Sequence, residues 1–158
     1  MLQGLNDIQN GFLDQARSCL DQALEAAPDM PDVHFSLGLL EEEAGDSELA
    51  CHHYQWATQH DPRHAQAQIN LGLLLKQAGE LGQAERRFRM AIDSDPALPE
   101  AHVNLANLLQ QSGRGSEAEA SARQALTLKP ALAEAHRNLS GVLLWQNRIP
   151  EALQFALK

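Results

Sequence analysis

The stretch PEAHVNLANLLQQSGRGSEAEASARQALTLKP, residues 99–130, carries the pattern that decides the fold of this 158-residue chain. It closes on a proline that recurs at equal intervals along the sequence, at Pro28, Pro62, Pro96 and Pro130. A period of about 34 residues is the length of one helical hairpin in a stacked array. The spacing therefore predicts an all-α chain built from antiparallel helix pairs.

Several other columns of this period keep their residue type. With residue 99 as position 1, position 7 is leucine, position 8 is small, position 15 is glycine or asparagine, and positions 20 and 27 are alanine. These columns hold Leu37, Leu71, Leu105 and Leu139; Gly38, Gly72, Ala106 and Ser140; Gly11, Gly45, Gly79, Gly113 and Asn147; Ala16, Ala50, Ala84, Ala118 and Ala152; and Ala23, Ala57, Ala91 and Ala125.

Each column has a physical role in a helical hairpin. Glycine or asparagine at position 15 can adopt the left-handed conformation that ends the first helix, and the alanines let two helices approach closely. The proline at position 32 blocks continuation of the second helix. Pro31 and Pro99 fall in the first turn of the next helix, where a missing N–H is harmless. The predicted unit is helix, tight turn, helix.

These columns resemble those of the tetratricopeptide repeat (TPR) family over nearly the whole length. The resemblance implies a right-handed superhelical solenoid and a single array over residues 1–158. Complete repeats are expected at residues 31–62, 65–96 and 99–130, with partial repeats at 1–28 and 133–158. Since the array would begin in mid-helix and stop inside a second helix, we expect a piece of a longer protein or an array capped by another chain. The alternative is a small complete protein with ragged ends.

The composition fits a helical protein without a membrane segment. Aromatic residues make up only 4% of the chain, and the apolar runs fall far short of the roughly 18 residues that span a bilayer. The N-terminus has neither the basic start nor the apolar core of a secretion signal. Cys19 and Cys51 lack metal-type spacing and are expected to be packed or surface thiols. We therefore expect a cytoplasmic location.

No motif indicates catalysis or a cofactor. The sequence contains no nucleotide-binding glycine loop, nucleophile elbow or paired zinc-ligand motif. His52, His53 and His60 follow one another along a second helix, but no cysteine or carboxylate stands in ligand register, so we expect no metal site. A net charge of −9 and one pair of clustered arginines, Arg86–Arg87, argue against nucleic acid. The chain is not expected to be an enzyme.

Helical periodicity divides the first helix of each repeat into two faces. Positions 3, 4, 7, 8, 10, 11 and 14 are mostly apolar or small and should form the core. His34, His102 and His136, at position 4, belong to this face, which predicts a packing role for them. Positions 2, 5, 6, 9, 12 and 13 should line the concave groove, as they do in the TPR family.

Position 6 places a column of asparagines in this groove, at Asn70, Asn104 and Asn138. Asparagine is a mediocre helix former, and its amide can donate to and accept from a peptide backbone at once. The column resembles the asparagine ladder of the O-linked N-acetylglucosamine transferases, which implies that these residues contact a bound polypeptide. Ser36 departs from the ladder and weakens it at its N-terminal end. The alternative is that asparagine is merely common at this position.

One known use of a TPR groove is not expected here. Repeats that bind the carboxyl terminus of chaperones combine asparagines with basic residues at positions 2, 5 and 6. Asn107 and Asn138 could serve as the asparagines. Position 2, however, holds Asp32, Glu100 and Glu134, and position 5 holds Phe35, Ile69 and Val103. Without cations, a bound carboxylate would have no counter-charge.

Acidic side chains are concentrated in the first part of the chain. Residues 1–62 carry twelve of them against Arg17 alone, whereas residues 63–158 carry nine acidic and eleven basic side chains. Asp32, Glu42 and Glu43 fall on the groove face, which indicates that a basic segment of a partner binds at the N-terminal end. The alternative is a solvated acidic face that only aids solubility.

The groove is expected to become apolar toward its C-terminal end. Positions 12 and 13 of successive repeats hold Glu42 and Glu43, Lys76 and Gln77, Gln110 and Gln111, and finally Leu144 and Trp145. An exposed Trp–Leu pair would be a natural binding anchor. The alternative is that Trp145 packs on a continuation of the array or on a second copy of the chain.

Taken together, these patterns predict non-catalytic recognition of another protein, through an extended segment bound along Asn70, Asn104 and Asn138. One alternative is that the array is the substrate-recognition region of a larger enzyme, such as a glycosyltransferase. Another is a self-association module that stacks through its open terminal helices. The identity of the partner cannot be inferred from such an array, because the same fold serves many functions.

Overall fold

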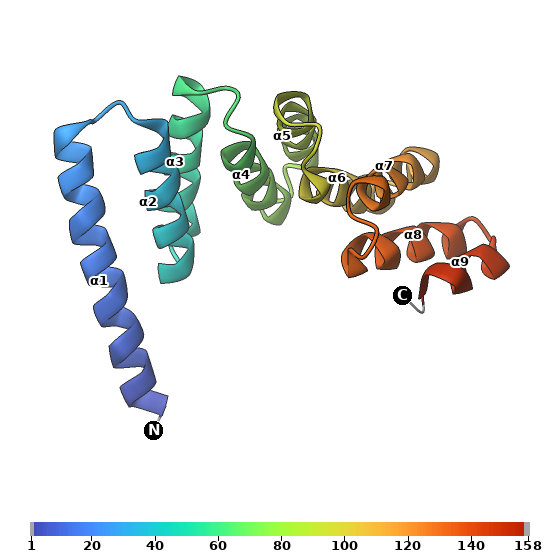
Figure 1. Ribbon diagram of the computed structural model, residues 1–158, viewed down its shortest axis with the longest axis horizontal. Helices are drawn as coiled ribbons and strands as arrows, with labels where there is room; N and C mark the ends of the chain where they lie inside the picture. Colours follow the sequence, from blue (N-terminus) through green and yellow to red (C-terminus); the bar gives the residue numbers. More distant parts are fainter. Residues whose placement is uncertain (1, 157–158) are drawn as a thin grey trace. The chain divides into compact units, whose positions relative to one another are not determined.

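The computed structural model describes the backbone of residues 2–156 and the side chains of residues 12–156. This part of the chain contains nine α-helices and no strand (Figure 1). The helices are α1 (Leu2–Ala26), α2 (Pro31–Ala44), α3 (Ser47–His60), α4 (Ala65–Gln77), α5 (Leu81–Ser94), α6 (Pro99–Gln111), α7 (Gly115–Leu128), α8 (Ala133–Trp145) and α9 (Ile149–Ala156). The all-α class predicted from the sequence is confirmed.

The chain divides into two compact units, an N-terminal unit over Met1–Leu71 and a C-terminal unit over Gly72–Lys158. In the N-terminal unit, α2 packs against α3 and α1 packs against α2. In the C-terminal unit, the pairs α6–α7 and α8–α9 lie side by side, as Figure 1 shows, and α7 also contacts α8. The repeat boundaries expected from the sequence stay a prediction.

The turn between the two helices of a hairpin is made by the residue at position 15. Gly45, Gly79 and Gly113 adopt φ angles of 85°, 82° and 74°, and Asn147 adopts 60°. Only this left-handed conformation lets the chain leave the first helix and return in the second, and an L side chain other than asparagine would strain it. The predicted role of this column is confirmed at all four positions.

The first predicted turn, at Gly11, does not form. Helix α1 runs without interruption from Leu2 to Ala26, so the chain does not turn at Gly11. The partial repeat expected over residues 1–28 stays a prediction. A glycine inside a helix costs only about 1 kcal/mol relative to alanine. Each added residue of a continuous helix gains a backbone hydrogen bond, which favours propagation once the helix has formed.

The small columns allow close packing within each hairpin. The alanines at positions 20 and 27 are fully buried, from Ala50 and Ala57 through to Ala152. Gly38 and Gly72, at position 8, lie against the rings of Tyr54 and Phe88, which are themselves fully buried. Because glycine has no Cβ, each ring can occupy the space that a Cβ would take, and an aromatic residue fits between the two helices.

The core of the C-terminal unit is continuous from α5 to α9. Phe88, Leu105, Leu108 and Val142 belong to one cluster of buried side chains. A second cluster joins α6, α7, α8 and α9 and consists of Ala106, Ala122, Leu139, Leu143 and Ala152. Each hairpin therefore buries its apolar face against the next, which is how a repeat array builds its core.

At two repeats the position 4 side chain bonds to the carbonyl of the helix-ending proline. Gln68 donates to the carbonyl of Pro62 at 3.1 Å, and His136 donates from Nε2 to that of Pro130 at 2.7 Å. All four position 4 side chains are buried, His34 and His102 included. The predicted packing role of these histidines is confirmed, and the structure adds the reason why the position is polar: a proline carbonyl buried without a donor would be costly.

Candidate partner-binding surface

The first-helix face of the C-terminal unit carries amide side chains from α4 and α6. Lys76 of α4 donates to the Oδ1 atom of Asn107 in α6 at 2.6 Å. Asn104, one turn before Asn107, is half-buried, and its side chain has no hydrogen-bond partner among the described residues. Gln77 and Gln111, predicted on the same face, are both exposed. This surface therefore offers an amide at Asn104 that is available to a partner, beside the hydrogen bond between Lys76 and Asn107.

Asn138 is placed differently from Asn104. Its side chain is only 6% exposed, and its amide donates to the backbone carbonyl of Val103 at 3.3 Å, which ties α8 to α6. Val103, at position 5, is also buried, at 2% exposure. The expectation that position 5 lines the groove is wrong at Val103, because α8 covers it through Ala135 as well as Asn138. The proposed contact of Asn138 with a bound polypeptide stays a prediction.

Gln110 is half-buried beside the backbone of α8. Its Nε2 atom would lie 3.0 Å from a Cβ built on Gly141, so this glycine leaves room for the amide between the two helices. Of the predicted groove residues on α6, Asn104 and Gln111 are therefore the ones with a side chain available to a partner. The resemblance of the position 6 column to that of the O-linked N-acetylglucosamine transferases stays a prediction.

In the N-terminal unit, the predicted groove residues belong to a hydrogen-bonded chain. Asn70 donates to the hydroxyl of Tyr54 at 3.1 Å, and that hydroxyl donates to the carboxylate of Glu42. Burial and the neighbouring Glu42 carboxylate raise the pKa of the Tyr54 hydroxyl well above its usual range. One N–H and the Oδ1 atom of Asn70 remain for other partners.

Asp32 and Glu43 are exposed on the same unit. Asp32 lies 3.3 Å from Nε2 of His64, so part of its charge is balanced when this histidine is protonated. Whether these carboxylates receive a basic segment of a partner stays a prediction.

A part-buried ion pair joins α1 to α2. Glu41 is only 2% exposed, and its two carboxylate oxygens accept from Nη1 and Nη2 of Arg17 at 2.6 and 2.8 Å. The sequence placed Glu41 on the core face without explaining its charge. The sequence does contain a clue to the partner of Glu41, because Arg17 is the only basic residue, histidine aside, in residues 1–62. A two-point contact of this kind fixes the geometry of both side chains.

Histidines and aromatic rings form a stack between α2 and α3. The Nδ1 atoms of His34 and His53 are 3.0 Å apart, so one ring donates and the other accepts. The ring of His34 stacks on that of Trp56 at a centroid distance of 3.7 Å, and Trp56 stacks on His60 at 3.6 Å. Burial lowers the pKa of His34 and of His53 below the usual imidazole range. The described residues contain no group of three side chains that could hold a metal ion.

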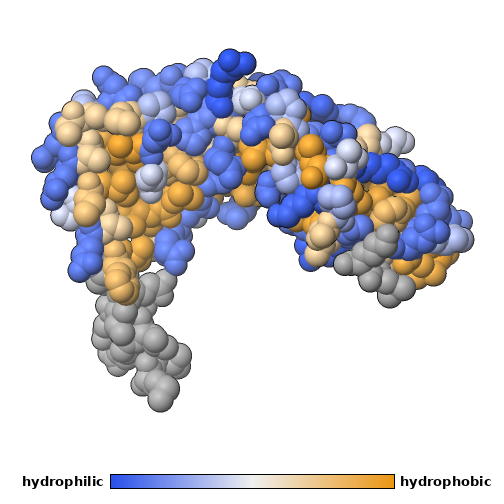
Figure 2. Space-filling view, viewed as in Figure 1, coloured by the Kyte–Doolittle hydropathy of each residue, from blue (hydrophilic) through white to orange (hydrophobic). Residues whose placement is uncertain are grey.

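The predicted Leu144–Trp145 pair is exposed but faces two different surfaces. Leu144 is 52% exposed and lines an open cleft of about 480 Å³ with Arg137, Ser140 and Phe155. Trp145 is 67% exposed and lines a separate cleft of about 570 Å³ at the turn between α6 and α7. Figure 2 shows apolar surface in the region of α8 and α9. The two residues therefore line different clefts, and their role as a binding anchor stays a prediction.

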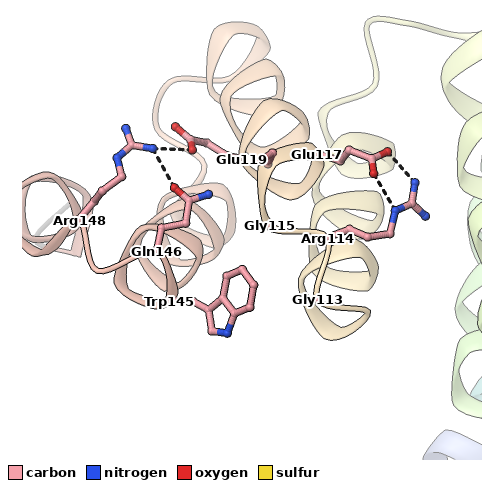
Figure 3. A pocket seen from close by; sticks show the side chains of 9 residues that line it. Gly113, Arg114, Gly115, Glu117, Glu119, Trp145, Gln146 and Arg148 are labelled. Atoms are coloured by element: carbon pink, nitrogen blue, oxygen red, sulfur yellow. Dashed lines mark hydrogen bonds and ion pairs between the residues drawn. The ribbon is translucent and has the colours of Figure 1, made fainter.

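An ion-pair ladder, absent from the sequence predictions, joins the second helices of the C-terminal unit. Arg114 donates to Glu85 of α5 at 2.7 Å and to both oxygens of Glu117 in α7 at 2.7 and 2.6 Å, as Figure 3 shows for Glu117. The arrangement recurs one repeat later, where the three members are Arg148, Glu119 and Glu151. Each arginine therefore links its own hairpin to the preceding one.

The ladder shifts the acidity of its carboxylates. Hydrogen bonds from Arg114 hold the pKa of Glu117 below its usual range. Burial alone would raise the pKa of Glu119, yet the hydrogen bonds from Arg123 and Arg148 outweigh it and lower that pKa as well. The carboxylates are consequently ionised at neutral pH, and the arginines beside them are compensated.

Comparison with known proteins gives a consistent family and fold. A family model described as tetratricopeptide repeat matches residues 1–51, 43–99 and 103–158. A crystal structure of MamA is 18% identical and superposes with a TM-score of 0.82 over 96% of this chain and 88% of that one. PilF of Pseudomonas aeruginosa is 24% identical, with a TM-score of 0.83 over 98% of this chain and 70% of that one. At these identities the likeness concerns the fold.

A further MamA structure, MamA AMB-1, is 24% identical and superposes with a TM-score of 0.74 over 97% of this chain and 84% of that one. No curated protein sequence matches the chain. Within residues 2–156, no helix is both long enough and apolar enough to cross a membrane.

Proposed function

The chain belongs to the tetratricopeptide repeat family, and on this premise we propose that it is a non-catalytic module that binds an extended segment of another protein. Stacked helical repeats present continuous surfaces that suit such partners. Each unit would supply backbone-binding amides by itself, through Asn70 on the N-terminal unit and through Asn104 on the first-helix face of the C-terminal unit. A basic stretch of the same partner would pair with Asp32, Glu42 and Glu43 of the N-terminal unit.

The observation that carries the proposal is the free amide of Asn104. Because this amide is partly exposed, it can bond to water in the free chain and to the backbone of a bound segment in the complex. Its neighbours Asn107 and Lys76 are already bonded to each other, so they do not compete for it. An extended backbone, which offers a carbonyl and an N–H at regular spacing, would satisfy both groups of this amide.

Affinity capture from native lysate tests the proposal, with the double variant Asn70→Ala, Asn104→Ala compared with the unmodified chain. The matched control is Gln124→Ala, which removes an exposed amide from the second helix α7. We expect specific partners to be lost with the double variant and retained with the control, while circular dichroism shows equal helicity for all three proteins. An unchanged set of captured proteins would contradict the proposed role of this face.

A further inference from the structure

Helix α1 packs against α2 on one side and carries a second apolar face that stays open (Figure 1). The residues of this open face follow one another at intervals of four, three, four and three, so they form one row along the helix. They are Phe12, Ala16, Cys19, Ala23 and Ala26. Phe12 is 66% exposed, Ala23 is half-buried, and the other three are exposed. Figure 2 shows apolar surface along the part of α1 that it colours.

Two residues of the open face have buried equivalents in the later hairpins. Ala16 and Ala23 stand at positions 20 and 27, where the alanines from Ala50 onward are no more than 1% exposed. Ala118, for example, belongs to one buried cluster with leucines of its own first helix, α6. In α1 the backbone runs straight through Gly11, so residues 2–10 extend away from Ala16 and do not fold back over it. The open face thus has the residues of a packed helix pair without a second helix.

The row continues toward the N-terminus in the sequence and contains no charge. Leu5 and Ile8 precede Phe12 by seven and four residues, which keeps them in the same helical register. The acidic residues of α1 fall about half a turn around the helix, at Asp7, Asp14, Asp21 and Glu25. A charged partner would therefore find no counter-charge in the row, whereas an apolar helix could pack along it.

The order of side-chain sizes along the row indicates which helix fits it. The large side chains come first and the small ones follow, in the order Leu5, Ile8, Phe12, Ala16, Cys19, Ala23. Two such helices that ran in the same direction would place large residues against large ones and leave gaps between the small ones. In the antiparallel direction, with the two Phe12 residues at the centre, Ile8 faces Ala16 of the other copy and Leu5 faces Cys19. The row is therefore complementary to itself about a two-fold axis.

We propose that two copies of this chain associate through their α1 helices, which pair antiparallel about a two-fold axis near Phe12. The contact is closed, because each copy uses its whole open face and leaves none for a third copy. It therefore differs from an open stack of terminal helices, which would grow without limit. The inference does not depend on the proposed function, since neither Asn70 nor Asn104 lies on α1.

Sedimentation equilibrium of the full chain, at concentrations up to about 0.5 mM, tests the association. Ala16→Glu places a carboxylate in the apolar contact, and Ser18→Glu is the matched control, because it adds the same charge at an exposed position outside the row. We expect twice the mass of one chain for the unmodified protein, association weakened about tenfold or more in Ala16→Glu, and little change in Ser18→Glu. Since each copy carries a net charge of −9, added salt should tighten the association.

Disulfide cross-linking under mild oxidation tests the direction of the two helices. Cys51→Ser leaves Cys19 as the only thiol. In this background Leu5→Cys should give a cross-linked dimer, because residue 5 faces Cys19 of the other copy. Asp7→Cys, half a turn away, should not, and neither should Cys19 alone.

Several results would overturn the proposal. They are a chain that keeps the mass of one copy at every concentration, a mass that grows beyond two copies, equal weakening by Ala16→Glu and Ser18→Glu, and a cross-link through Cys19 alone, which requires parallel helices. Circular dichroism should show equal helicity for both glutamate variants, since residues 16 and 18 are exposed in the single chain. Ala16→Glu should still capture the partners that Asn70 and Asn104 bind, so the two proposals can fail separately.

Discussion

At the scale of single residues, the structure distinguishes glycines that make room for a neighbour from glycines that do not. A Cβ at Gly72 would lie 2.6 Å from the Phe88 ring, which is fully buried and has no space to move into. We expect Gly72→Ala to destabilise the chain by about 1–3 kcal/mol through overpacking. Urea unfolding followed by circular dichroism measures the effect.

The control for this substitution is Gly82→Ala, in helix α5. Nothing lies within 4 Å of the position where its Cβ would be built. Alanine is the better helix former, so this variant should be more stable by about 0.5–1 kcal/mol. If the two substitutions changed the free energy of unfolding equally, a Cβ at Gly72 would not overpack against the Phe88 ring, and the prediction would be wrong.

The two asparagines Asn104 and Asn138 should also respond differently to truncation. Asn138→Ala removes the hydrogen bond that ties α8 to the Val103 carbonyl in a buried site, and should cost about 0.5–1.5 kcal/mol. Asn104→Ala removes no hydrogen bond within the protein and should leave the melting temperature unchanged. Thermal unfolding of both variants checks the expectation, which fails if Asn104→Ala is as destabilising as Asn138→Ala.

At the scale of helices, the ion-pair ladder couples the stability of α5, α7 and α9 to pH. The pKa values of Glu117, Glu119 and Glu151 are lowered in the folded chain, so the unfolded chain binds more protons as the solution is acidified. The contribution of the ladder is therefore complete above the usual glutamate pKa of about 4.5 and is lost as pH falls below it.

Replacing one arginine of the ladder should reduce this pH dependence. We expect Arg114→Gln to melt at a lower temperature than the unmodified chain at pH 7, and to lose less stability between about pH 5 and pH 3, because Glu117 has lost its partner. Calorimetry across this range measures both effects. Arg137→Gln serves as the control, since Arg137 is largely exposed and lies 3.8 Å from Glu134. A steeper pH dependence in Arg114→Gln would contradict the assignment.

The contact between α2 and α3 responds to pH in a higher range. His34 and His53 have lowered pKa values in the folded chain, and protonation of both rings would place two donors 3.0 Å apart. Stability should therefore fall as pH decreases through about 6.5 and below. Fluorescence of Trp56 during urea unfolding, in a Trp145→Phe background, follows the N-terminal unit.

A substitution of His53, with one of His52 as the control, separates this effect from general acid unfolding. His53→Gln should flatten the pH dependence between about pH 7 and pH 5, because the titrating ring is gone. His52→Gln, on the exposed side of the same helix, should not. If both variants behave like the unmodified chain, the contact between His34 and His53 does not control the stability of the unit.

At the scale of the whole molecule, the features that recur in each repeat could be predicted and those that occur once could not. The left-handed turn at Gly79 and the buried Ala84 each have equivalents in the other repeats, so a column identified their roles. The pairing of Arg17 with Glu41 has no equivalent, and nothing in the local pattern indicates it. The turn expected at Gly11 does not form, because the residue type at one repeat position does not determine whether the helix ends there.

In the candidate site, too, the features that recur in each repeat could be predicted and the contacts between hairpins could not. Periodicity placed Asn104 and Gln111 on the first-helix face, and the structure finds both accessible. It could not show that α8 covers Val103 and engages Asn138, because this depends on how one hairpin lies on the next. The contact of Trp145 with Gly115 likewise joins two hairpins and could not be read from either alone.

The ion-pair ladder also means that the hairpins of this chain are not interchangeable modules. Position 16, which is Arg114 and Arg148 in the last two hairpins, is Asp46 in residues 31–62. Recombination that moved this hairpin to follow residues 99–130 would place Asp46 next to Glu119, and two carboxylates would face each other instead of an ion pair. The contacts between neighbouring hairpins thus depend on their order. Genes in which the hairpins are shuffled are expected to encode arrays of lower stability.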